Sequence, residues 1–124
     1  MLDHVSIGVR DLAAARRFYD AVFAPLGYRC LHDGDGYAGY GKDAPQFWLH
    51  ASEAPVPADD RSGLHFSFVA DSRKSVDAFH AAALNSGGQD NGKPGPRPDY
   101  GPTYYAGFAK DPDGYRIEAH TEAS

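Results

Sequence analysis

The stretch YAGYGKDAPQFWLHA at residues 37–51 returns near the end of the chain as YAGFAKDPDGYRIEA at residues 105–119. Six of the fifteen aligned positions are identical, and residues 4–27 align in the same order with residues 65–88. Identities across the two blocks include His4 with His65, Ser6 with Ser67, Phe18 with Phe79, Gly27 with Gly88, and Asp43 with Asp111. Two blocks repeated in one order predict that the chain consists of two copies of one structural unit.

The first copy predicts a strand, a helix and three further strands. Residues 2–9 alternate apolar with small or polar side chains, which is typical of a strand. Asp11 is the expected N-cap of a helix whose apolar residues recur at helical spacing, and Gly27 is its expected terminator. Short aromatic-rich segments follow near 27–32, 36–41 and 46–51, with glycine-bearing turns between them.

The second copy predicts the same order, with one long insertion. A strand is expected at 63–70, a helix capped by Ser72 and ended by Gly87 and Gly88, and strands near 104–109 and 114–120. Residues 89–104, QDNGKPGPRPDYGPTY, are rich in glycine and proline. We expect them to form either a lid that carries Arg97, Tyr100 and Tyr104 over a ligand or a plain surface loop.

These elements predict an α+β protein with two βαβββ modules in a single domain that covers residues 1–124. Module one is residues 1–51, the linker is 52–62, and module two is 63–124. Each module has one helix to cover one face of its sheet, so the other face meets a partner copy, a ligand or water. The residues expected in the core are Phe18, Tyr19, Val22, Phe23, Val76, Phe79 and Leu84, whereas His32 and His80 are expected to face solvent.

Composition excludes two classes of partner. The net charge of −5 argues against an electrostatic nucleic-acid binder, which needs a basic patch. No stretch approaches the roughly 18 uninterrupted apolar residues of a membrane span, and MLDHVSIGVR has no secretory pattern. Cys30 is the only cysteine and forms no internal disulfide, which fits a reducing compartment. We therefore expect a cytoplasmic protein that binds neither membranes nor nucleic acids.

The histidines of the two copies predict a metal site. In the opening strands the richer apolar face should pack on the helix, so His4 and His65 point to the opposite face. In the closing strands Glu118 shares the face away from the helix, and His50 is its counterpart in the aligned repeats. Two imidazoles and one carboxylate form a ligand set that leaves open positions for substrate. His4, His65 and Glu118 supply that set, and His50 is a possible fourth ligand.

Four further residues are candidates for binding substrate. Trp48 is expected beside His50, where it would stack on a ligand or lie in the core or a dimer interface. Tyr100 and Tyr104 belong to the predicted lid. Arg116 shares a face with Glu118 and would bind a substrate carboxylate or form a simple salt bridge.

The segments LDHVSIGVRDLAAARRFY, GLHFSFVA and DPDGYRIEA resemble the vicinal oxygen chelate superfamily, the glyoxalase, bleomycin-resistance and dioxygenase group. The resemblance implies paired βαβββ modules around a U-shaped cleft. It also implies that His4, His50, His65 and Glu118 hold one divalent metal ion. Imidazole nitrogens together with a carboxylate suit zinc, nickel, iron, cobalt or manganese. In such sites two neighbouring substrate oxygens bind the metal, which acts as a Lewis acid. Many single-pair members are dimers, so the resemblance implies a homodimer.

The resemblance leaves two functions open. His50 stands where glyoxalase I usually has glutamate or glutamine, which argues against a standard lactoylglutathione lyase. One expectation is a metal-dependent lyase, isomerase or oxygenase that acts on a small oxygen-bearing substrate, with Glu118 as a proton acceptor. The other is a metal-free protein that binds a drug or metabolite, as bleomycin-resistance proteins do. A third option is a structural relic whose sites have decayed.

Overall fold

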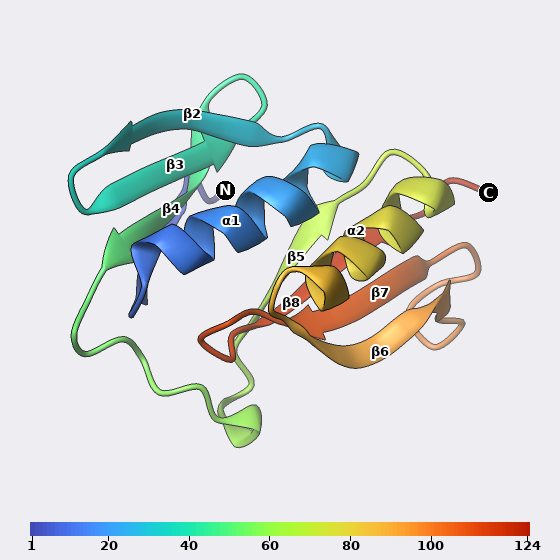
Figure 1. The fold of residues 1–124 in the computed structure, drawn as a ribbon. Helices are drawn as coiled ribbons and strands as arrows, with labels where there is room; N and C mark the ends of the chain where they lie inside the picture. The colour runs from blue at the N-terminus through green and yellow to red at the C-terminus, as the bar shows by residue number, and fades with distance from the viewer.

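A computed structural model describes residues 1–124 and contains two βαβββ units (Figure 1). The elements of the first unit are β1 (Val5–Val9), α1 (Leu12–Phe23), β2 (Arg29–Gly34), β3 (Tyr37–Gly41) and β4 (Pro45–Ala51). Those of the second are β5 (His65–Val69), α2 (Arg73–Asn85), β6 (Gln89–Pro96), β7 (Tyr105–Lys110) and β8 (Arg116–Thr121). The predicted α+β class and the two βαβββ units are confirmed.

Each unit forms its own four-stranded sheet with a helix on one face. The strand orders are β1-β4-β3-β2 and β5-β8-β7-β6, with the first pair parallel and the others antiparallel. The helices α1 and α2 pack against each other, and each lies in front of its own sheet (Figure 1). No helix is long and apolar enough to cross a membrane.

The helix boundaries follow the signals in the sequence. The carboxylate of Asp11 accepts a hydrogen bond from the N–H of Ala14 (3.1 Å), and the hydroxyl of Ser72 accepts one from the N–H of Ser75 (3.1 Å). Both side chains thereby satisfy backbone groups that a helix start leaves unpaired. After α1, a short 3-10 turn ends at Gly27, whose φ of 82° lies in the left-handed region that glycine adopts without strain.

One hydrophobic core joins the two units. Phe23 of α1 meets Phe68 of β5 edge-to-face with ring centroids 4.8 Å apart. Phe47 of β4 meets Phe66 at 5.6 Å and Phe68 at 5.2 Å. Aromatic pairs in this geometry stabilise a core beyond the burial of their area. The predicted core residues are buried except Leu84, which is 44% exposed because it lies on the solvent side of α2.

The expectation that residues 89–104 form one loop is wrong. The first half of this segment is β6, which pairs with β7 as the edge strand of the second sheet. Pro94 and Pro96 lack backbone donors and hid the strand in the sequence, yet an edge strand tolerates proline. His80 was expected in solvent, but it is buried and its Nε2 lies 2.9 Å from the Asp90 carboxylate of β6. The pair ties α2 to the edge strand.

Asp111 in the turn between β7 and β8 is a buried acid. It accepts hydrogen bonds from the hydroxyl of Tyr19 (2.7 Å) and from the N–H groups of Asp113 and Tyr115 (both 2.9 Å). Burial raises the pKa of Asp111 to about 6, and the hydrogen bonds offset part of this rise. The turn thus connects the second module to α1 of the first.

Replacing Asp111 with asparagine removes an ionisation that opposes folding. Because the pKa of the folded state is raised, Asp111 contributes fully to the free energy of unfolding below its unfolded pKa of about 4. This contribution is lost as the pH rises through about 6. The free energy of unfolding of the wild type, relative to Asp111→Asn, should therefore decrease between about pH 4 and 6 and stay constant above about pH 7.

Urea titrations at a series of pH values measure this difference. Asp43→Asn, an exposed aspartate at the aligned position of the first repeat, controls for the substitution itself. A difference between wild type and Asp111→Asn that stays constant over the acidic interval would contradict the assignment.

Candidate functional site

The face of the second sheet that points away from α2 carries the candidate site. Side chains alternate along strands, so His65 of β5 and Glu118 of β8 both leave the core on this side. Phe108 of β7 pairs with Glu118 and points the same way. These residues line an open hollow of about 460 Å³ together with Asn91, Tyr100, Tyr104 and Arg116. We call this hollow the module-two pocket.

Glu118 is buried at the floor of the module-two pocket by two hydrogen-bonding neighbours. Its exposed fraction is only 3%. The hydroxyl of Tyr104 donates to Oε2 at 2.5 Å, and Nε2 of His65 lies 2.9 Å from Oε1. Each carboxyl oxygen therefore has its own partner, which is what a buried carboxyl group requires. The imidazole of His65 remains about half exposed, so it connects the buried acid with solvent.

The three side chains form an array suited to proton transfer. Burial, followed by the hydrogen bond to Glu118, raises the pKa of Tyr104 to about 12, so its hydroxyl stays protonated at neutral pH and donates. His65 has a second ring nitrogen with no hydrogen bond inside the protein, through which a proton can pass to or from water. The arrangement can therefore accept a proton from a bound molecule at Glu118 and return it.

The segment after β6 forms one wall of the pocket. Tyr100 is 65% exposed and meets Tyr104 edge-to-face at 5.4 Å, and Tyr104 stacks on the ring of His120 at 4.6 Å. Arg97 does not reach over the pocket in the way that a lid residue would. Its guanidinium donates to the carbonyl groups of Lys93, Gly95 and Pro96, which fastens the loop to the end of β6.

Arg116 lies in the pocket without an ion partner. Its Nε donates to the carbonyl of Leu64 at 3.2 Å, and no carboxylate lies within ion-pair distance of it. The simple salt bridge considered from the sequence is absent. By contrast, the neighbouring Lys110 pairs with Asp60 at 3.0 Å. Arg116 is thus a cation of the pocket that forms no ion pair, and we call it the uncommitted cation.

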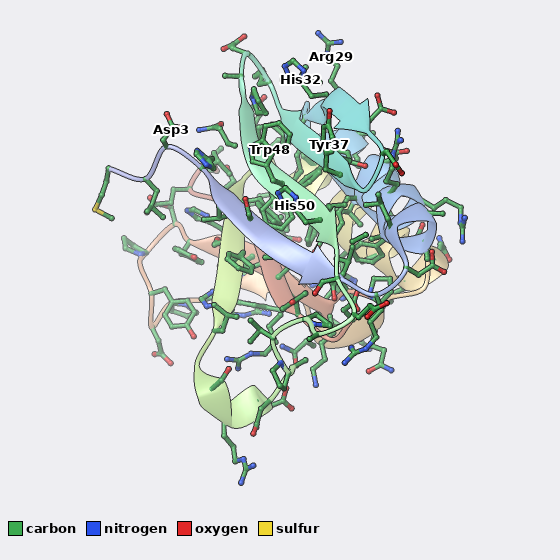
Figure 2. The ribbon with its side chains drawn as sticks, turned by 90° about the vertical axis from the view of Figure 1, so that its left-hand side faces the viewer. Asp3, Arg29, His32, Tyr37, Trp48 and His50 are labelled. Carbon is green, nitrogen blue, oxygen red and sulfur yellow. The ribbon has the colours of Figure 1, made fainter.

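Trp48 and His50 lie on the equivalent face of the first sheet, as Figure 2 shows. Trp48 lies between His32 and His50, with ring centroids 6.2 Å and 6.4 Å away. His4, whose Nδ1 is 2.7 Å from the Asp3 carboxylate, lines a shallow hollow of about 610 Å³ with Trp48 and His50. This hollow, which we call the module-one face, is open to solvent.

Within one chain, the four predicted metal ligands do not converge. His65 and Glu118 are adjacent, whereas His50 lies on the module-one face, and no group of three or more His, Cys, Asp or Glu side chains has metal-site geometry. Protein sites for divalent transition metals usually supply at least three donors. The residues of a single chain therefore do not fit such an ion, although imidazole and carboxylate are suitable donor types.

The assignment of His50 as the counterpart of Glu118 is wrong. In the sheets, Ser6 pairs with Trp48 and Ser67 pairs with Glu118, so Trp48 occupies the position equivalent to Glu118. The cause is turn length. The β3–β4 turn closes between Gly41 and Pro45, while the β7–β8 turn, which holds the DPDG segment, is longer and closes between Lys110 and Arg116. An alignment without a gap in this turn therefore matches Glu118 with His50, although the paired strands match it with Trp48.

Two pocket residues were missed from the sequence. Asn91 lies on β6, which the glycine and proline content concealed. Phe108 stands opposite Glu118 on β7, and the alternation of β7 identifies its face only when the pairing with β8 is known. An expected strand at 104–109 was the available signal, since it places Phe108 on the same face as Tyr104.

Comparisons with known proteins agree on one family. The model described as Glyoxalase/Bleomycin resistance protein/Dioxygenase superfamily matches residues 1–119. A glyoxalase/bleomycin resistance protein from Albidiferax ferrireducens T118 is 34% identical, with a TM-score of 0.84 and coverage of 97% of this chain and 98% of that one. No curated protein matches the chain.

Two more distant structures share the fold. One is a glyoxalase/bleomycin resistance protein/dioxygenase family enzyme from Burkholderia phytofirmans PsJN, at 19% identity, TM-score 0.74 and 98% coverage of both chains. The other is the fosfomycin resistance protein FosX from Mesorhizobium loti, at 21% identity and TM-score 0.71, with coverage of 98% of this chain and 91% of that one.

The hydrogen bond from Tyr104 to Glu118 should contribute measurably to stability. Tyr104→Phe leaves one oxygen of a buried carboxyl group unpaired, so we expect the free energy of unfolding to decrease by about 1–3 kcal/mol in urea titrations. Tyr100→Phe removes an exposed hydroxyl with no hydrogen bond in the protein and should cost less than about 0.5 kcal/mol. Equal decreases in the free energy of unfolding of the two variants would show that the hydrogen bond from Tyr104 to Glu118 does not stabilise the fold.

Proposed function

This chain belongs to the Glyoxalase/Bleomycin resistance protein/Dioxygenase superfamily, and from that premise we propose that it is an enzyme for a small oxygen-bearing substrate. The reaction is of the lyase or isomerase type and takes place in the module-two pocket. The observation that carries the proposal is the buried Glu118 carboxyl group, held between Tyr104 and His65 at the floor of an open hollow. A cytoplasmic location remains a prediction.

Each residue of the array has a separate task. Glu118 accepts the proton that the substrate loses and returns it at another atom, which is the proton movement of an isomerase or lyase. Tyr104 fixes the carboxyl group through Oε2 and remains a donor because the pKa of its hydroxyl is raised. His65, at the solvent end of the array, exchanges the proton with water through its free ring nitrogen.

The proposal is supported by the contrast between the two carboxyl environments of the site. The buried structural acid Asp111 is enclosed by its own turn and Tyr19, whereas the buried Glu118 lies beneath a cavity large enough for a small ligand. A carboxyl group in such a position is costly to maintain unless its neighbours compensate it. Its placement next to an open pocket is the arrangement expected of an acid–base catalyst.

Turnover of a panel of dicarbonyl, catechol and epoxide compounds tests this function. The compound that wild type converts should be converted about 10²- to 10⁴-fold more slowly by Glu118→Gln, since general acid–base catalysis contributes that much. Glu53→Gln, the same change at an exposed linker residue, should match wild type. Tight binding without turnover would overturn the enzyme and favour a metal-free binding protein. Turnover that survives Glu118→Gln would contradict the role assigned to Glu118.

A second candidate is a metal-dependent enzyme whose ion is held between two copies of the chain. His65 and Glu118 provide two adjacent donors in the module-two pocket, while His4 and His50 lie exposed on the module-one face. In a symmetric dimer the module-one face of each copy would meet the module-two pocket of the other, which would unite the four donors. A bound ion would supply Lewis-acid chemistry to substrate oxygens.

The metal content of the purified, untagged protein tests this second candidate. A dimer with about one transition-metal ion per chain is expected, since a two-fold axis creates two equivalent sites. The ion should be lost in His65→Ala and also in His50→Ala, and retained in His32→Ala, which changes an exposed histidine outside the donor set. A metal-free protein in elemental analysis, or an ion that remains bound without His50, would contradict the shared site.

A further inference from the structure

We propose that the module-two pocket selects a planar, aromatic carboxylate as its ligand. This inference deepens the proposed function, on which it rests for the role of Glu118, by naming the chemical class of the substrate. It follows from three features of the pocket: one uncommitted cation, a set of aromatic walls, and a fixed spacing between the cation and the buried acid.

The cation is Arg116. It lines the pocket, lies in no ion pair, and uses only Nε for a hydrogen bond inside the protein, to the carbonyl of Leu64. The two terminal nitrogens of its guanidinium therefore remain available. A guanidinium group matches a carboxylate through two parallel hydrogen bonds, which makes it a better anchor for a planar anion than a lysine.

No acidic group of the pocket pairs with Arg116. The only acidic group in the lining is Glu118, which is buried and already bonded to Tyr104 and His65. Lys110 on the neighbouring strand is neutralised by Asp60. Arg116 is thus the only arginine or lysine that lines the pocket, and no ion pair neutralises its guanidinium group.

The walls of the pocket are aromatic. Phe108 forms the side next to Glu118, and Tyr100 and Tyr104 form the wall after β6. The guanidinium of Arg97 lies over the ring of Phe108 at 5.3 Å and holds that ring in place from the loop side. Aromatic rings prefer the flat faces and edges of other rings, with centroids about 4.5–7 Å apart. The walls therefore favour a ligand ring over an aliphatic chain.

The spacing along β8 sets the position of the reacting atom. Arg116 and Glu118 are two residues apart on the same face, which corresponds to about 7 Å along a strand. A carboxylate bound by Arg116 would therefore leave the far side of the ligand ring near Glu118 and His65. A hydroxyl group at that end is the part of the ligand from which the Glu118 carboxyl group would take a proton.

Three probes of matched size separate the contributions of charge and ring. Benzoate has both features, benzamide lacks the charge, and cyclohexanecarboxylate lacks the flat ring. In NMR titrations of the full chain, benzoate should shift the amide signals of β8 and bind about tenfold more tightly than either of the other two. Equal affinities for benzoate and benzamide, or no benzoate binding at millimolar concentration, would overturn the proposal.

Variants then assign the two features to residues. Arg116→Gln should weaken benzoate binding by about tenfold and abolish the preference over benzamide, whereas Arg29→Gln, an exposed arginine of the first sheet, should leave both unchanged. Phe108→Leu should remove the preference for benzoate over cyclohexanecarboxylate. Benzoate binding that is unaffected by Arg116→Gln would contradict the assignment.

The Glu118→Gln variant distinguishes this inference from the proposed function. Benzoate binding should persist in this variant, because Arg116 and the aromatic walls of the pocket are unchanged. If the catalytic role of Glu118 is wrong but the ligand class is right, Glu118→Gln will still prefer benzoate to benzamide. If that preference is missing in both wild type and Glu118→Gln, the ligand class itself is wrong.

Discussion

The shortage of helices is the constraint on which the rest of this structure depends. Each four-stranded sheet has a single helix, so each buries only one face, and the two covered faces merge into one core through Phe23, Phe47 and Phe68. The other face of each sheet remains available for polar side chains. Because side chains alternate along a strand, the ionisable residues His65 of β5 and Arg116 and Glu118 of β8 all lie on that second face.

The two free faces have become different. At the equivalent positions of β4 and β8, the first module has Trp48 and the second has Glu118. The module-one face is an exposed row of rings around Trp48, whereas the module-two pocket holds a buried carboxyl group that is bonded to Tyr104. The two units therefore share one scaffold but present different side chains on their free faces.

Burial of Glu118 also explains how the site is organised. A buried carboxyl group needs partners for both oxygens, and Tyr104 and His65 are the two side chains within reach. This leaves Arg116 as the group that faces an incoming molecule with unused donors. The same geometry places only two suitable metal donors, His65 and Glu118, together in one chain.

The sequence alone determined the repeat, the two βαβββ units, both helix caps and the faces of His65 and Glu118, because caps and strand alternation are local properties. It did not reveal β6, since prolines at an edge strand resemble a loop, nor the burial of His80 against Asp90. It also aligned His50 with Glu118, because identical letters in the two turns concealed their different lengths. Strand register, the pocket around Arg116 and the separation of His50 from Glu118 were decided by the tertiary structure, since pairing between distant segments fixes which side chains meet.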